Sequence, residues 1–279
     1  MTSPITLITG TSSGIGLEAA VQAAAAGHTV IATMRNTDRS QALRDAASTA
    51  GVTVDIRQLD VTDAASIENC IASVVADFGG LDALVNNAGA GHVGTLENET
   101  LEEVRGVMEV NFFGVVAVTK AALPHLRASG GRVITVSSVG GAVGQPFSEA
   151  YCAAKFAVEG FMQSLAPVAE TVGVRVSIVE PGAVASEFVP NIGLSAATMV
   201  AEAGPYGAAL DAYLARSGTS FANAQTAASA ASTIVDVLTA DAPALRVQTS
   251  PGARAFVGAS LSDLDGSAVL GLTREWVAG

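Results

Sequence analysis

The sequence predicts an α/β domain built on a doubly wound parallel sheet, with helices covering both faces of the sheet. Short apolar runs rich in β-branched residues alternate with helix-length stretches between residues 5 and 179. Parallel strands are buried on both faces, so they read as nearly continuous apolar runs. A glycine-rich turn joins the first strand to the first helix, and no linker rich in Pro, Ser or charge divides the chain. We therefore expect one domain over residues 1–279.

The apolar runs and their boundaries place the elements in order. Strands are expected at residues 5–9, 29–33, 52–59, 81–85, 133–136 and 174–179. Helices are expected at residues 16–26, 39–50, 63–78, 101–126 and 149–172, and Asp63 suits the N-cap of the third helix. Gly, Pro and Ala punctuate short helical stretches in residues 186–221, which predict either a mobile insertion over the substrate or a core-packed helix.

Composition and charge exclude several classes of protein. The net charge of −12 leaves no basic surface of the kind that nucleic-acid binding requires. Mean hydropathy is +0.44, yet we expect no membrane span of roughly 20 apolar residues, because Glu18, Lys120 and clusters of Gly and Ser interrupt the apolar segments. Cys70 and Cys152 predict neither a disulfide framework nor a metal site. We expect a cytoplasmic protein that binds no metal.

Tyr151 and Lys155 are one helical turn apart, so their side chains are expected to share a helix face. A lysine ammonium near a phenol favours the phenolate, which predicts a tyrosine pKa lowered from about 10 toward neutrality. Such a tyrosine can serve as a general acid or base. The same spacing is also typical of a partly exposed tyrosine beside a solvated lysine, so the interpretation depends on other residues.

A dinucleotide site is predicted where the first strand meets the first helix. Gly10, Gly14 and Gly16 would let the backbone turn sharply and approach a pyrophosphate that the helix N-terminus stabilises. The third strand is followed by Asp60 and Val61. Asp60 is equally suited to accept a hydrogen bond from the adenine amine and to cap a helix.

Two further strand ends bear on the cofactor. Asn87, Ala88 and Gly89 follow the fourth strand, at the sheet edge where ligands of open α/β sheets bind, although Asn-Asn-x-Gly is also a good turn. An acid ending the second strand would hold the ribose 2′-OH of NAD, whereas an arginine accommodates the 2′-phosphate of NADP. Arg35 follows that strand with no acid before it. We therefore expect NADP(H) to be favoured over NAD(H), unless Arg35 is only a solvated surface charge.

With these motifs in place, residues 9–186 resemble the short-chain dehydrogenase/reductase family, whose fold is Rossmann-like. The glycine turn, the Asn-Asn-Ala-Gly at 86–89 and the Pro-Gly at 181–182 match the family pattern. The resemblance implies catalytic roles for Asn111, Ser138, Tyr151 and Lys155. It implies cofactor contacts from Gly10, Ser12, Ser13, Gly14, Ile15, Gly16, Arg35, Asp60, Val61, Asn87, Ala88, Gly89, Tyr151, Lys155, Pro181, Gly182, Val184 and Ser186, the last standing where the family commonly has Thr.

Within the family, residues 138–160 and the tail at 265–276 are most similar to the estradiol and retinol dehydrogenases, and we read residues 251–279 as a C-terminal extension. This likeness implies a lipophilic, steroid- or retinoid-like secondary alcohol or ketone. Arg216 and Gln145 depart from the steroid enzyme, which has a histidine and a leucine there. The expected substrate contacts are Ser138, Val143, Gln145, Tyr151, Arg216, Phe221 and Glu275. Further apolar wall candidates are Phe147, Phe188, Val189 and Tyr206.

The resemblance also implies a mechanism, in which Ser138 holds the substrate carbonyl and Tyr151 exchanges its proton while the nicotinamide carries the hydride. Lys155 would depress the tyrosine pKa and hold the nicotinamide ribose, and Asn111 would position a water, unless it only bonds a helix backbone. The alternative function is an NADP(H)-binding sensor without turnover. Family members usually pair through helices matching 101–126 and 149–172, so a homodimer or homotetramer is expected.

Overall fold

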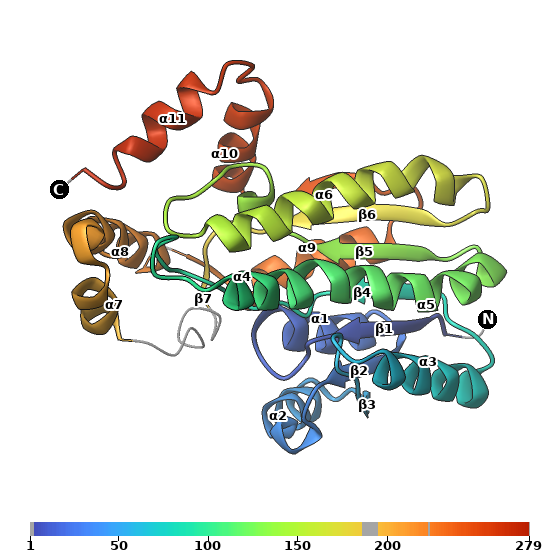
Figure 1. Cartoon of the computed structure of the whole chain (residues 1–279). Helices are drawn as coiled ribbons and strands as arrows, with labels where there is room; N and C mark the ends of the chain where they lie inside the picture. Colours follow the sequence, from blue (N-terminus) through green and yellow to red (C-terminus); the bar gives the residue numbers. More distant parts are fainter. Residues whose placement is uncertain (1–2, 186–194, 223, 279) are drawn as a thin grey trace.

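A single parallel sheet runs through the computed structural model, which describes residues 3–185, 195–222 and 224–278 (Figure 1). Its strands are β1 (Ile5–Thr9), β2 (Thr29–Met34), β3 (Asp55–Gln58), β4 (Ala83–Asn86), β5 (Arg132–Val136), β6 (Arg175–Glu180) and β9 (Arg246–Gln248). Their order across the sheet is β3-β2-β1-β4-β5-β6-β9, and each neighbouring pair is parallel. The predicted doubly wound parallel sheet is confirmed.

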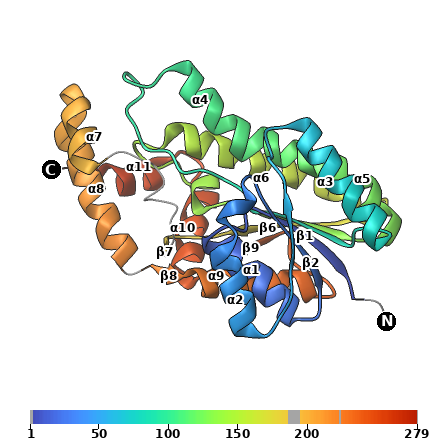
Figure 2. The same cartoon turned by 90° about the horizontal axis from the view of Figure 1, so that it is seen from below.

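Helices cover both faces of the sheet (Figure 2). The helices of one face are α1 (Gly14–Ala25), α2 (Gln41–Ala50) and α9 (Ala227–Thr239). Those of the other are α3 (Ala64–Phe78), α5 (Gly114–Ser129) and α6 (Glu149–Glu170), with α4 (Leu101–Met108) packed on α6. Short turns η1 (Thr37–Arg39) and η3 (Val139–Gly141) follow β2 and β5. Each face therefore buries its own apolar core against the sheet.

The expected elements are all present, with shifted ends. The strand expected at 52–59 is shorter, and the helix expected from residue 39 begins at Gln41 after η1. Asp63 caps α3 as predicted, since its Oδ1 accepts hydrogen bonds from the N–H groups of Ala65 (2.9 Å) and Ser66 (3.3 Å). Strand β9 and helix α9 were not predicted. Both lie C-terminal to the stretch where apolar strands and helices alternate clearly.

One helical run differs from the sequence-based expectation about membrane spans. Helices α4 and α5 join through the π-helical turn η2 (Glu109–Phe113), which makes Leu101–Ser129 one run of 29 residues. By length and composition alone this run could cross a membrane, because Lys120 and the few other charged residues do not lower its hydropathy enough. In the fold it packs on α3 and α6, as a helix of a covered sheet does.

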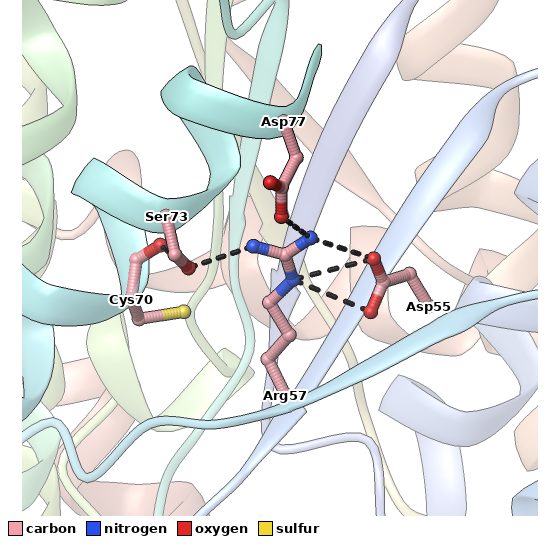
Figure 3. Close-up of polar contacts among 5 residues, drawn as sticks. All are labelled: Asp55, Arg57, Cys70, Ser73 and Asp77. Carbon is pink, nitrogen blue, oxygen red and sulfur yellow. Dashed lines mark hydrogen bonds and ion pairs between the residues drawn. The ribbon is translucent and has the colours of Figure 1, made fainter.

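An arginine ties the edge strand β3 to α3 (Figure 3). The Arg57 guanidinium contacts Asp55 at 2.7 Å and Asp77 at 2.8 Å, and its Nη1 donates to Ser73 Oγ at 2.7 Å. These bonds, the Asp55 bond foremost, raise the pKa of Arg57. The contacts fasten the short edge strand to the helix that packs on it.

The C-terminal third adds a cap beyond the carboxyl ends of the strands (Figure 1). It contains β7 (Val184–Ala185), α7 (Ala196–Glu202), η5 (Gly204–Tyr206), α8 (Gly207–Ala222), β8 (Gln225–Thr226), α10 (Pro251–Leu261) and α11 (Ser267–Arg274). Strands β7 and β8 pair with each other in a separate two-stranded sheet, and α8 precedes β8 in the chain. A buried apolar cluster joins this cap to the loop after β5, and it contains Phe147, Leu210 and Tyr213.

Candidate active site

The loops after β1 and β4 meet where the strand order reverses. In open α/β sheets, ligands bind in the crevice at this point. Thr9 Oγ1 accepts hydrogen bonds from the N–H groups of Asn87 and Ala88, both at 3.0 Å. The Asn87 amide donates in return to the carbonyl oxygens of Thr9 (2.9 Å) and Gly10 (3.0 Å). The side chain of Asn87 therefore fixes the two predicted cofactor loops against each other.

The glycine turn has the shape that a close phosphate approach requires. Gly10 and Gly14 have φ values of 72° and 59°, a region that disfavours other residues. A Cβ on Gly16 would lie 2.3 Å from the Gly10 carbonyl oxygen and from Asn87 Nδ2. Ser13, the N-cap of α1, makes no side-chain capping bond. The first-turn N–H groups of α1 can therefore receive an anion, and this turn fits a dinucleotide pyrophosphate.

The remaining cofactor candidates surround this turn. Arg35 is exposed directly after β2, and Ser12, Ile15 and Val61 are half-buried. Asp60 does not cap α3, because its Oδ1 accepts from the N–H (3.0 Å) and hydroxyl (2.8 Å) of Thr62. Of the two interpretations of Asp60, the helix cap is wrong. Pro181, Gly182 and Val184 follow β6 at the same sheet edge, and Ser186 lies outside the described residues.

Ser138, Tyr151 and Lys155 come together at the end of β5. The side chains of Ser138 and Tyr151 both lie next to Gly140. If Gly140 had a Cβ, that atom would lie 3.4 Å from Ser138 Oγ and 3.4 Å from Tyr151 Cε1. Lys155 is 4% exposed, and its Nζ donates to the Val136 carbonyl oxygen at 3.1 Å. That Nζ is 5.7 Å from the centre of the Tyr151 ring. Helix α6 thus presents the phenol and the ammonium to the strand end that carries Ser138, as the spacing predicted.

The expected lowering of the Tyr151 pKa is not found. Burial raises the pKa of the Tyr151 phenol to about 12, against the opposing effect of a hydrogen bond with Ser138. Burial also lowers the pKa of Lys155 to about 8, and the charge of Glu159 opposes that change. The four-residue spacing indicates only the attraction between ammonium and phenolate. Desolvation of both groups outweighs it here, because each is enclosed by the fold.

Asn111 lies in the π-helical turn between α4 and α5. Its Nδ2 donates to the carbonyl oxygens of Ala90 and Val107, both at 3.0 Å, and its Oδ1 accepts from the Ala90 N–H at 3.2 Å. Single π turns inside helices occur often at functional sites. A Cβ on Gly89 would lie 2.9 Å from Asn111 Oδ1 and 3.6 Å from Lys155 Nζ. Asn111 therefore bonds helix backbone, and it also borders the lysine across Gly89.

The predicted substrate residues divide into two groups. Near the reacting end, Gln145 Nε2 would lie 3.3 Å from a Cβ on Gly140, which also adjoins Ser138 and Tyr151. Val143 and Phe147 are buried close by, and Phe147 has a φ of 59°. This conformation is rare for a bulky residue and is held by packing on Tyr213, whose ring centre is 5.6 Å away.

Arg216 and Glu275, the predicted far-end contacts, are both exposed and come from α8 and the segment after α11. The Arg216 guanidinium lies over the Trp276 ring, 5.0 Å from its centre, and Trp276 stacks on Phe256. Trp276 was not among the predicted contacts, although a lone tryptophan beside Glu275 was a usable signal. Tyr206 is exposed and bonds Glu97. Phe188 and Val189 lie outside the described residues, as does the side chain of Phe221.

The structure thus brings together the predicted site: a glycine-rich turn at the start of α1, and a serine, a tyrosine and a lysine at the end of β5. The family model described as "short chain dehydrogenase" matches residues 4–197. Human retinol dehydrogenase 8 is 39% identical over 254 residues, covering 88% of this chain and 80% of that protein. Rat estradiol 17-beta-dehydrogenase 1 is 43% identical over 195 residues, covering 67% of this chain and 56% of that protein.

A solved structure agrees with the sequence matches. A point variant of actinorhodin polyketide ketoreductase with NADPH superposes with a TM-score of 0.76 at 28% identity, covering 90% of this chain and 97% of that one. The chain belongs to the short-chain dehydrogenase/reductase family, and is an NAD(P)-dependent oxidoreductase acting on CH–OH groups.

Proposed function

We propose that this enzyme transfers a hydride between NADP(H) and a lipophilic secondary alcohol or ketone, with Tyr151 as general acid and base. The observation that carries the proposal is the meeting of Ser138 and Tyr151 around Gly140, beside a buried Lys155 and the phosphate-binding turn of α1. When bound, the nicotinamide supplies the hydride chemistry. The side chains at this site bind the substrate and transfer the proton.

Each side chain has a role that its position supports. The Ser138 hydroxyl accepts the Gly140 N–H at 3.0 Å and can donate to a substrate oxygen near Tyr151. Tyr151 gives its proton to that oxygen in reduction and removes it in oxidation. Lys155 holds positive charge near the phenol, and its position beside Gly89 suits a bond to a ribose hydroxyl. Asn111 borders Lys155 and would anchor the water that returns the proton.

The preference for NADP(H) rests on Arg35. Arg35 is exposed and comes directly after Met34, the last residue of β2. No acid ends this strand to hold the ribose 2′-OH of NAD. A guanidinium suits a 2′-phosphate because it offers several N–H donors in one plane. The similar ketoreductase structure contains NADPH, which agrees with this choice.

The substrate class rests on the apolar surroundings of the site. Val143 and Phe147 are buried beside Gln145, and Leu210 and Tyr213 extend the same apolar packing into α8. Two similar enzymes are named for retinol and estradiol, both lipophilic alcohols. We propose that residues 186–221 and 251–279 cover the substrate, with Arg216 or Glu275 orienting its far end.

Pairing of two copies through the helical run of α4, η2 and α5 and through α6 is also part of the proposal. Phe113, Phe156 and Val168 are 50%, 45% and 64% exposed, and an apolar groove of about 310 Å³ lies between α5 and α6. Exposed apolar patches of this kind mark protein contacts. Phe156→Glu should give monomers in light scattering, whereas Leu261→Glu, at an exposed site on α10, should leave the assembly unchanged. A monomeric unmodified protein would contradict the pairing.

A cytoplasmic location completes the proposal. The net charge of −12 disfavours binding to anionic membrane surfaces. Cell fractionation of the tagged protein checks this, with recovery in the membrane pellet as the contrary outcome.

The experiment that tests the proposed function combines a substrate panel with one variant. The unmodified protein and Tyr151→Phe are incubated with NADP(H) or NAD(H) and a set of steroids, retinoids, aliphatic ketones and small polar ketones. We expect turnover of lipophilic compounds, faster with NADP(H), that Tyr151→Phe reduces about 10²- to 10⁴-fold while cofactor binding persists. Turnover confined to small polar ketones would refute the substrate class. Cofactor binding without any turnover would favour a sensor.

A further inference from the structure

Two buried glutamates lie behind the site, and the mechanism above does not use them. Glu159 on α6 is 3% exposed and Glu180 at the end of β6 is 0% exposed. Buried carboxylates cost free energy unless they are paired, so such residues need an explanation.

Arg246 forms an ion pair with both carboxyl groups. Arg246 Nε on β9 lies 3.1 Å from Glu159 Oε2 and 3.8 Å from Glu180 Oε1. Gln248 Nε2 donates to Glu180 Oε2 at 2.5 Å, and Arg246 Nη2 donates to Gln163 Oε1 at 3.1 Å. The Glu159 carboxyl also interacts with the Ser137 hydroxyl and with the Glu180 carboxyl. One cation therefore faces two carboxyl groups, and a second compensating charge or a proton is needed.

Lys155 is a candidate for that second charge, because the charge of Glu159 acts on it. Tyr151, Lys155 and Glu159 are spaced by four residues each on α6, so they follow one face of the helix. A Cβ on Gly141 would lie 2.9 Å from Glu159 Cγ, 2.6 Å from Ser137 Oγ and 3.1 Å from the Lys155 carbonyl oxygen. Glu159 thus lies next to the turn that follows Ser138, and one helical turn from Lys155.

The charges of these groups depend on one another. Burial lowers the pKa of Lys155 to about 8, and the charge of Glu159 is what opposes this. Burial raises the pKa of Glu159 to about 7, with Glu180 acting in the same direction and Ser137 and Arg246 in the opposite one. Within the described residues, the charged groups facing Glu159 are Lys155 on α6, Glu180 on β6 and Arg246 on β9.

We infer that Glu159 is a positioning residue for Lys155: its carboxylate keeps the buried ammonium protonated and held on Val136, while Glu180 and Arg246 govern whether Glu159 is charged. The inference rests on the proposed function for its catalytic consequence. A protonated Lys155 is what stabilises the Tyr151 phenolate during alcohol oxidation. Glu159 therefore acts on the reaction through Lys155, without touching the substrate.

The two lysines of the sequence, Lys120 and Lys155, allow a direct test. Protein labelled with ¹³C at lysine Cε gives two side-chain signals by NMR, and Lys120→Arg assigns them. The exposed Lys120 serves as internal reference. We expect Glu159→Gln to lower the titration midpoint of Lys155 by about one pH unit, the effect of removing one charge a helical turn away in a partly shielded site.

Glu180→Gln is the matched comparison, because it removes an equally buried carboxylate. Glu180 opposes the ionisation of Glu159, so its removal should leave the Lys155 midpoint unchanged or higher. Glu170→Gln, at an exposed site on the same helix, should leave it unchanged. Equal lowering in Glu159→Gln and Glu180→Gln would show a general structural effect and overturn the inference, as would an unmoved midpoint in Glu159→Gln.

Activity provides the second readout. The alkaline limb of alcohol oxidation in Glu159→Gln should move to lower pH by the same amount as the Lys155 midpoint. Because the NMR titration needs no turnover, a shifted midpoint in an inactive protein would refute the proposed function and leave the electrostatic link intact. If Glu159→Gln does not fold, Glu159→Asp replaces it, and an unchanged midpoint together with a changed alkaline limb would overturn the link.

Discussion

Lys155 donates a hydrogen bond to the carbonyl oxygen of Val136 at 3.1 Å, and so ties helix α6 to the end of strand β5. The bond uses one of the three ammonium protons. It places the charge between Tyr151 and the Gly89 loop, with the remaining protons available to a ligand. The position of this lysine therefore follows from the fold, and its charge depends on the surroundings.

Lys155→Met should damage the enzyme in two ways, whereas Tyr151→Phe should damage it in one. Methionine keeps the length of the side chain but removes the charge near the phenol and the donor near Gly89. We expect turnover to fall by about 10²- to 10⁴-fold and cofactor affinity by about 10- to 100-fold, as a lost bond from a charged donor implies. Fluorescence titration and initial rates separate the effects, and unchanged cofactor affinity would contradict the proposed ribose contact.

Gly16→Ala should weaken cofactor binding and stability together. Its Cβ would lie 2.3 Å from the Gly10 carbonyl oxygen, so the backbone of the glycine turn must move. Overpacking of this kind costs about 1–3 kcal/mol. Thermal melting and cofactor titration measure both effects. Gly80→Ala is the control, because a Cβ there meets no atom within 4 Å and the residue has no positive φ; similar losses in both variants would contradict the argument.

Arg35→Ala should change the choice of cofactor. Without the guanidinium, affinity for NADP(H) should fall about 10- to 100-fold while affinity for NAD(H), which has no 2′-phosphate, changes little. Parallel titrations with the two cofactors measure the ratio. Arg105→Ala removes another exposed arginine, on α4, whose contact is Glu102, and should leave the ratio unchanged. An unaltered ratio in Arg35→Ala would show that this arginine is only a solvated charge.

The parallel sheet was predictable because its signals are local. The buried strands read as apolar runs, and caps such as Asp63 and turns such as Gly10 carry their own sequence preferences. The meeting of Asn111, Ser138, Tyr151 and Lys155 was predictable only through the resemblance to a family. Spacing relates Tyr151 to Lys155, but nothing in the sequence alone brings residue 111 beside residue 155.

What the sequence could not supply was the balance of burial against charge. The spacing of Tyr151 and Lys155 predicted a lowered phenol pKa, whereas burial raises it, because desolvation depends on all the surrounding segments. The Glu159 cluster was missed for a similar reason. Its arginine comes from β9, the strand that was not predicted, and Glu159 itself reads as an ordinary polar position on a helix.

The raised pKa of Glu159 predicts a pH-dependent difference in stability. Between pH 4.5, the ordinary value, and about 7, the folded chain binds a proton that the unfolded chain has lost, so this group's contribution to stability falls as pH rises. Glu159→Gln lacks that dependence. The melting temperature of Glu159→Gln, relative to that of the unmodified protein, should therefore be higher at pH 8 than at pH 5. For Glu170→Gln this relative melting temperature should be the same at both pH values. A difference that stays constant between the two pH values would mean that Glu159 titrates alike in the folded and unfolded chains.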